Sequence, residues 1–155
     1  MPTLDELDRV AWRQDEQPPW NEPGEVARAL RDLALASPET GQDAYSRVLY
    51  TVGNNHAGTY YPVVLTVVPF LGAILRSGGP IARLRTLDVL IDLLGSFWPA
   101  AGFEVVATPT GNRALRDLLR QEVLGLEGDV LRCQVEAASA AESALAQQLL
   151  AELRQ

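Results

Sequence analysis

The sequence predicts an all-α fold in one domain that spans residues 1–155. The length of 155 residues suits a single domain with a real core. The apolar share of 47% is typical of a globular chain and argues against disorder. Apolar residues recur at intervals of three and four along nearly the whole chain, which is the periodicity of helices that bury one face.

The N-terminal part is expected to hold three helices. A capping box of Thr3 and Glu6 opens the first, which runs to about residue 14. A proline-rich segment, residues 17–24, separates it from a second helix over about residues 25–36. Ser37-Pro38 stops that helix, and a third follows over about residues 42–52.

The middle of the chain predicts two helices of high apolar content. The fourth covers about residues 60–76, with Pro69 expected to kink it. Its uncharged run is shorter than the roughly 18–20 residues that cross a bilayer, so it is expected to be a buried core helix. The fifth, about residues 80–97, is expected to pack antiparallel against it. The residues expected to be nearly inaccessible are Val64, Leu71, Leu84, Leu87, Ile91 and Leu94.

The C-terminal third is expected to begin with an irregular segment. Within it, residues 103–108 are suited to a short extended piece. A sixth helix is expected over about residues 112–124. Asp129 is expected to cap a seventh helix, rich in alanine and leucine, that reaches as far as Leu153.

These helices group in pairs, the second with the third, the fourth with the fifth and the sixth with the seventh. The central pair resembles a HEAT unit, with Pro69 in its first helix, arginine early in its second and a closing Leu-Leu-Gly95. The resemblance implies a short HEAT-like α-solenoid of about three antiparallel helix pairs behind an N-terminal helix. A compact irregular helix bundle is the alternative.

The charge balance restricts the partners. The chain has 20 acidic and 13 basic residues, a net charge of −7. Nucleic acids and anionic membranes need clustered cations, so neither is expected as a partner, and a basic partner is favoured. A single cysteine, Cys133, excludes an internal disulfide. The acidic N-terminus lacks the apolar core of a signal peptide, so the expected location is the cytoplasm.

The first candidate site is the loop Gly53–Pro62, with the sequence GNNHAGTYYP, which holds the only histidine. Its candidate binding residues are Asn54, Asn55, His56, Tyr60 and Tyr61. The alternative is an ordinary turn, in which glycine and asparagine adopt left-handed backbone and His56 or Thr59 hydrogen-bonds the loop. No second histidine or nearby cysteine accompanies His56, so neither a metal nor a cofactor is expected.

The second candidate site is a narrow polar strip on the fifth helix. Asp88 and Asp92 lie one turn apart, so both carboxylates face the same way, and Arg85 precedes Asp88 by three residues. One hypothesis is a solvated or salt-bridged surface. The other is an acidic strip that faces a partner, because the second helices of HEAT pairs commonly line a concave surface. No catalytic role is expected for either carboxylate.

The chain as a whole is similar to a bacterial HEAT-like family associated with immunity to polymorphic or secreted toxins. The similarity rests on its acidic, lysine-free helical sequence and on the loop around His56. It implies a non-enzymatic protein that covers the active site of a basic toxin domain with its acidic face. Candidate anchors for such a contact are Trp20, Tyr60, Tyr61 and Trp98. The alternative is a regulatory protein that binds a small molecule or a cation, and a helical enzyme is a third hypothesis.

Overall fold

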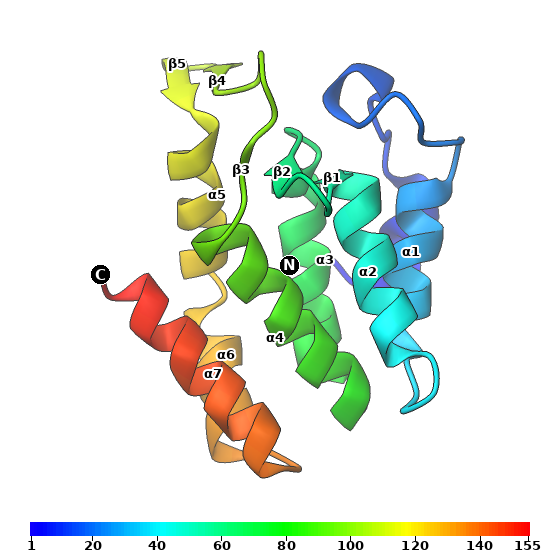
Figure 1. The fold of residues 1–155 in the computed structure, drawn as a ribbon, viewed down its shortest axis with the longest axis vertical. Helices are drawn as coiled ribbons and strands as arrows, with labels where there is room; N and C mark the ends of the chain where they lie inside the picture. The colour runs from blue at the N-terminus through cyan, green and yellow to red at the C-terminus, as the bar shows by residue number, and fades with distance from the viewer.

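The computed structural model describes all 155 residues and is mostly helical (Figure 1). The α-helices are α1 (Glu25–Ala34), α2 (Gly41–Val52), α3 (Val64–Ser77), α4 (Pro80–Gly95), α5 (Leu115–Leu124), α6 (Glu127–Val135) and α7 (Ala140–Leu153). Two short 3₁₀ helices, Leu4–Arg9 and Gln14–Glu16, precede them. The prediction of a helical fold is therefore confirmed, and no helix combines the length and the apolar character needed to cross a membrane.

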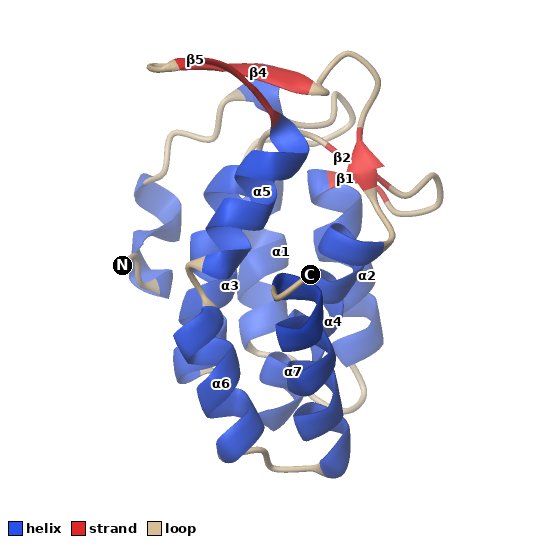
Figure 2. Cartoon of the chain, turned by 90° about the vertical axis from the view of Figure 1, so that its left-hand side faces the viewer, coloured by secondary structure: helices blue, strands red, loops and turns tan.

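Two small sheets accompany the helices. The first joins β1 (Gly53–Asn54), β2 (Thr59–Tyr60) and β3 (Trp98–Pro99) in the order β1-β2-β3. The second is an antiparallel hairpin of β4 (Val105–Thr108) and β5 (Gly111–Ala114). Figure 2 shows both sheets at the same end of the molecule, above the ends of the helices.

The helices are arranged in two layers. In Figure 1, α2, α4 and α7 lie in front, while α1, α3, α5 and α6 lie behind them. Helix α4 occupies the middle of the front layer and packs against α2 on one side and α7 on the other. Helix α3 lies in the middle of the back layer and packs on α1, α4, α5 and α6. The loop around His56 immediately precedes α3, and the polar strip lies on α4 itself.

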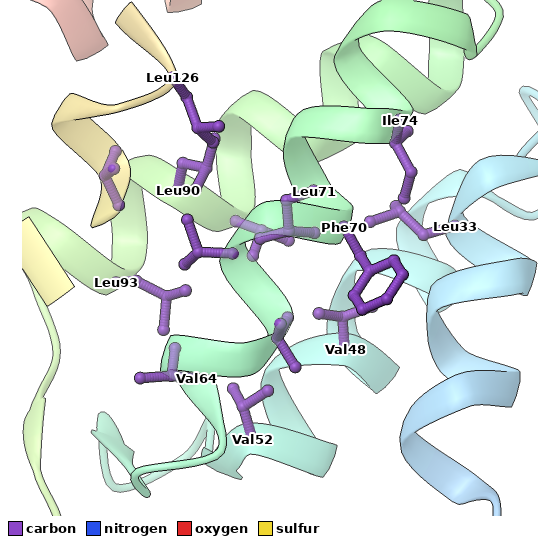
Figure 3. Packing of buried hydrophobic residues seen from close by; sticks show 14 of the residues in the cluster. Leu33, Val48, Val52, Val64, Phe70, Leu71, Ile74, Leu90, Leu93 and Leu126 are labelled. Atoms are coloured by element: carbon purple, nitrogen blue, oxygen red, sulfur yellow. The ribbon is translucent and has the colours of Figure 1, made fainter. Parts of the chain in front are cut away.

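The core is centred on α3, as its apolar sequence predicts. Val64 and Leu71 are completely inaccessible, and α3 contributes nine buried residues. Figure 3 shows Phe70, Leu71 and Ile74 surrounded by apolar side chains from the neighbouring helices, among them Leu33, Val48, Leu90 and Leu126. Pro69 lies within the helix without ending it. Helix α3 packs directly on α4, so its burial helps to position the helix that carries the polar strip.

The prediction for α4 is right for one face and wrong for another. Leu87 is fully buried, whereas Leu84, Ile91 and Leu94 are only half-buried. Helix α4 turns one side to solvent between α2 and α7, and these three residues lie close to that side. The residues buried beside Leu87 are Ala82, Thr86, Val89, Leu90 and Leu93. Half-buried leucine and isoleucine therefore flank the polar strip.

The N-terminal helix is shorter than predicted and is of the 3₁₀ type. Thr3 makes no side-chain capping bond; only its carbonyl oxygen accepts, at 3.0 Å from the Glu6 nitrogen. Leu7 is the only fully buried residue of this segment. A short helix in water is marginal without a packed face, so a single anchoring leucine does not stabilise a long α-helix here.

The long helix predicted over residues 129–153 is wrong, because two helices, α6 and α7, pack against each other there. Ser139 ends the connection between them, and its Oγ accepts a hydrogen bond from the Glu142 nitrogen at 3.1 Å. The Glu142 carboxylate in turn accepts from the Ala138 nitrogen at 3.1 Å. This arrangement resembles a capping box, except that Glu142 accepts from Ala138 and not from the N-cap residue Ser139, and it opens α7 where the alanine-rich sequence suggests continuity.

The start of the sixth predicted helix also differs. Residues 112–114 belong to β5, and α5 begins only at Leu115. Gly111 has a φ of +114°, which closes the hairpin with β4 through a turn that favours glycine. The short extended piece predicted over residues 103–108 is present as β4, from Val105 onwards.

Candidate functional site

The loop around His56 is an ordered β-hairpin at the end of α2. Gly53 pairs with Tyr60, and Asn54 pairs with Thr59. The Asn54 Oδ1 atom accepts hydrogen bonds from the backbone nitrogens of His56 at 3.0 Å and Ala57 at 3.1 Å. Gly58 completes the turn with a φ of +69°. The predicted special backbone is therefore present at Gly58.

The other parts of the turn prediction need correction. Gly53 has an extended φ of −176°, and neither Asn54 nor Asn55 has a positive φ. Gly53 is needed for a different reason, because a Cβ there would lie 1.8 Å from the Thr59 carbonyl oxygen. The two strands can approach only where a side chain is absent. Asn54 acts through its side chain, which caps the turn.

The hairpin presents some of its predicted binding residues and buries another. His56 is exposed, and no hydrogen bond to its ring is found. Asn54 and Asn55 are half-buried. Tyr60 is fully buried, which is incompatible with its predicted role as a surface anchor. Its side chain belongs to the buried core cluster of the molecule.

Tyr61 belongs to an aromatic cluster formed by Trp20, Tyr50, Tyr61 and Phe103. The rings of Trp20 and Tyr50 stack at 5.4 Å between centroids, and Tyr61 meets Trp20 edge-on at 6.1 Å. The Trp20 indole also donates a hydrogen bond to the Tyr50 carbonyl oxygen at 3.1 Å. Trp20 is 37% exposed and Tyr50 is 44% exposed. The cluster is thus fixed in place and still offers aromatic surface to solvent.

The polar strip of α4 is half-buried and makes contacts within the protein. The Arg85 guanidinium lies 3.3 Å from an Asp88 carboxylate oxygen. The Tyr45 hydroxyl, from α2, donates a hydrogen bond to Asp92. Arg85, Asp88 and Asp92 are all of intermediate exposure. The strip is therefore neither a freely solvated surface nor a buried ion pair.

The charge of Arg85 does not fully compensate for the burial of the Asp88 carboxyl. Burial raises the pKa of the Asp88 carboxyl, Arg85 acts in the opposite direction, and the charge of Asp92 adds to the rise. Burial and the hydrogen bond to Asp92 raise the pKa of Tyr45. The ionised form of Asp88 is therefore less well solvated than in water, even with Arg85 beside it.

The hairpin and the strip meet at the C-terminal end of α4. Strand β2 pairs in parallel with β3, which follows α4, and the Trp98 nitrogen donates to the Gly58 carbonyl oxygen at 2.9 Å. The Asp92 carbonyl oxygen accepts from the nitrogens of Ser96 and Phe97 at 3.0 Å. The two segments predicted separately from the sequence are thus one turn of helix apart.

Tyr45 was not predicted as a site residue, and the contact of the predicted anchor Trp98 with Arg116 was not predicted either. Tyr45 belongs to the apolar stripe of its helix in the sequence, and its contact with Asp92 spans 47 positions. Trp98 is 56% exposed, and the Arg116 guanidinium lies 4.0 Å from the centre of its ring. Both contacts join residues distant in sequence, so no local pattern indicates them.

No family model, curated protein or solved structure matches the chain. Within the chain, no three residues of the types His, Cys, Asp or Glu converge in a way that could hold a metal ion. The arrangement around Asp88 and Asp92 offers half-buried carboxylates, one guanidinium and one tyrosine hydroxyl. These groups are suited to recognising cationic side chains.

Proposed function

We propose that this protein binds another protein and inhibits it, in the manner of an immunity protein that covers the active site of a toxin. The binding surface is the outer face of the layer α2, α4 and α7. The observation that carries this proposal is the half-buried acidic strip at the centre of that layer, with the His56 hairpin at its end. The proposed site of action is the cytoplasm.

The proposed architecture is a short HEAT-like solenoid. The pairs α1/α2 and α3/α4 would be its first two units, and α7 would be the second helix of the third unit. The first helix of that unit would be divided into α5 and α6. In such an array the second helices line one continuous face, which here is the proposed binding surface.

Electrostatics favour a partner that supplies arginine or lysine. Asp88 already bears a desolvation cost, visible as its raised pKa, and a second cation from a partner would stabilise its ionised form. Complementary charge mainly raises the association rate and makes it sensitive to salt. The net charge of −7 also attracts a basic partner at long range and so raises the association rate.

Tight binding requires buried apolar anchor residues in addition to complementary charge. Trp20 and Tyr50 of the aromatic cluster, together with Trp98, offer large exposed rings near the hairpin. Aromatic side chains held in fixed positions are frequent hot spots, because they bury area at little entropic cost. Leu84 and Ile91 beside the acidic strip add half-buried apolar surface.

The test begins with basic proteins encoded next to this chain in its genome. Each is produced in a host cell with and without this protein, and growth and complex formation are measured. The double variant Asp88→Asn plus Asp92→Asn is expected to fold, to bind with a slower association rate and to show a weaker dependence on salt. The charge-matched control is Asp5→Asn plus Glu122→Gln, since both residues are exposed and form no ion pair.

Equal loss of association rate in both double variants would show that only net charge matters and that the strip is not the contact. If no neighbouring gene product is bound or neutralised, the inhibitor proposal is refuted. A loss of folding in the Asp88 and Asp92 variant would assign the strip a structural role.

A further inference from the structure

A separate pocket of ≈ 240 Å³ lies between the C-terminal end of α4, strand β2 and helix α5. Its apolar wall is formed by Leu93, Leu94 and Leu119. Its polar lining consists of Tyr60, Arg116, Asp117 and Arg120. Figure 2 looks onto this side of the molecule, with α5 and the C-terminal end of α7 in front. None of the lining residues belongs to the acidic strip.

The Tyr60 side chain, which contributes to this lining, lacks a hydrogen-bond partner. Tyr60 is 0% exposed, and its hydroxyl forms no hydrogen bond within the protein. A buried polar group left without a partner costs roughly 1–3 kcal/mol. Burial raises the pKa of Tyr60 to about 12, so at neutral pH the hydroxyl is a proton donor. A ligand oxygen that accepts from this hydroxyl would satisfy it.

Arg116 is a cation without an anionic partner in the same pocket. Its guanidinium stacks on the Trp98 ring at 4.0 Å, and it forms no ion pair. Stacking uses the face of the guanidinium and leaves its N–H edges free to donate. Arg120, by contrast, is tied to the C-terminal end of α7, because its Nη2 atom donates to the carbonyl oxygens of Glu152, Leu153 and Gln155 at 2.9 to 3.1 Å.

We propose that this pocket binds the carboxylate of a small organic acid with a short apolar chain. One carboxylate oxygen accepts from the Tyr60 hydroxyl, the other accepts from Arg116, and the chain contacts the leucine wall. Arg116 is exposed and held on one side only, so its side chain can move aside to admit the ligand. The inference goes beyond the proposed inhibition, because it requires no protein partner.

The lining restricts the ligand further. One free guanidinium and one free hydroxyl match the two oxygens of a single carboxylate. Asp117 at the same pocket repels a second negative charge, which disfavours a phosphate dianion. The volume is below the roughly 300–1,000 Å³ of sites for drug-sized ligands, so a chain of only a few carbons fits.

The test is a titration of the ¹⁵N-labelled protein with butyrate, followed by NMR. Butyramide, a neutral analogue of the same shape, and inorganic phosphate serve as comparison ligands. Butyrate is expected to shift the amide signals of Tyr60, Leu93 and Arg116 in a saturable way, while butyramide and phosphate do not. The variants Tyr60→Phe and Arg116→Gln are each expected to weaken butyrate binding by about tenfold.

The control variant is Arg113→Gln, which removes an exposed arginine of the neighbouring strand that bonds Gln121 instead of lining the pocket. It should bind butyrate as the unaltered protein does. Tyr60→Phe removes only an unpartnered hydroxyl, so it should fold at least as stably. Butyramide binding as tightly as butyrate, unchanged affinity in both pocket variants, or no saturable shift at all would each overturn the proposal.

Discussion

The contact between Glu142 and Arg83 allows a quantitative prediction. The Glu142 side chain is 1% exposed, and its two carboxylate oxygens lie 2.9 and 3.1 Å from two nitrogens of the Arg83 guanidinium. The same carboxylate accepts from the Ala138 nitrogen. The variant Glu142→Gln keeps the size of the side chain but removes its charge, so it leaves the paired guanidinium without an anion.

The expected loss follows from the burial of the pair. Removing one partner of a buried ion pair costs about 3–5 kcal/mol. Arg83 retains 21% exposure of its side chain, so part of its charge can be rehydrated, and the lower end of about 3 kcal/mol applies. In a chain of this size each kcal/mol lowers the melting temperature by about 2–4 °C, which gives a decrease of about 6–12 °C.

The measurement is urea and thermal unfolding followed by circular dichroism. The matched control is Glu136→Gln, an exposed glutamate at the end of α6 without an ion pair, which should change stability by less than about 0.5 kcal/mol. A double-mutant cycle with Arg83→Met isolates the coupling. A loss below about 1 kcal/mol for Glu142→Gln, the range of a surface pair, would refute the reasoning.

Four further outcomes are expected. Leu71→Ala in the centre of α3 should cost about 2–5 kcal/mol in urea unfolding; a smaller loss would contradict its place in the core. Gly53→Ala should disrupt the hairpin, seen as altered amide shifts around Thr59, because the new Cβ would meet the carbonyl oxygen there. Gly128→Ala, whose Cβ has nothing within 4 Å, should be neutral or stabilising. Because the native pKa of Asp88 is raised, the native state gains stability relative to Asp88→Asn as pH falls through that pKa, and an unchanged difference in unfolding free energy would refute this.

The positions of the helices could be predicted where a stretch of apolar periodicity is bounded by proline or glycine. Helices α1 to α4 begin and end within a few residues of prediction, because Pro38, Gly53 and Pro80 mark real turns. The break before α7 was missed although Ser139 and Glu142 have the spacing of a capping box. The alanine-rich composition on both sides masked it, since intrinsic propensity there favours a continuous helix.

The candidate sites were predictable only in part. The order of the His56 hairpin and its glycine turn followed from local turn chemistry. The burial of Tyr60 did not, because the side chain packs in a core built from elements distant in sequence, and its strand pairs with β3 some 40 positions away. The contact of Tyr45 with Asp92 also depends on the packing of α2 against α4. Contacts of this kind leave no periodic signal in a single sequence.

The parallel pairing of β2 with β3 has a mechanical consequence. Here the Trp98 nitrogen donates to the Gly58 carbonyl oxygen at 2.9 Å and the Ala100 nitrogen donates to the Tyr60 carbonyl oxygen at 2.8 Å. These bonds join the connection after α2 to the connection after α4, so the two connections cannot separate without breaking them. This end of the molecule should therefore be stiff, and in the proposed complex it would lose little internal entropy on association.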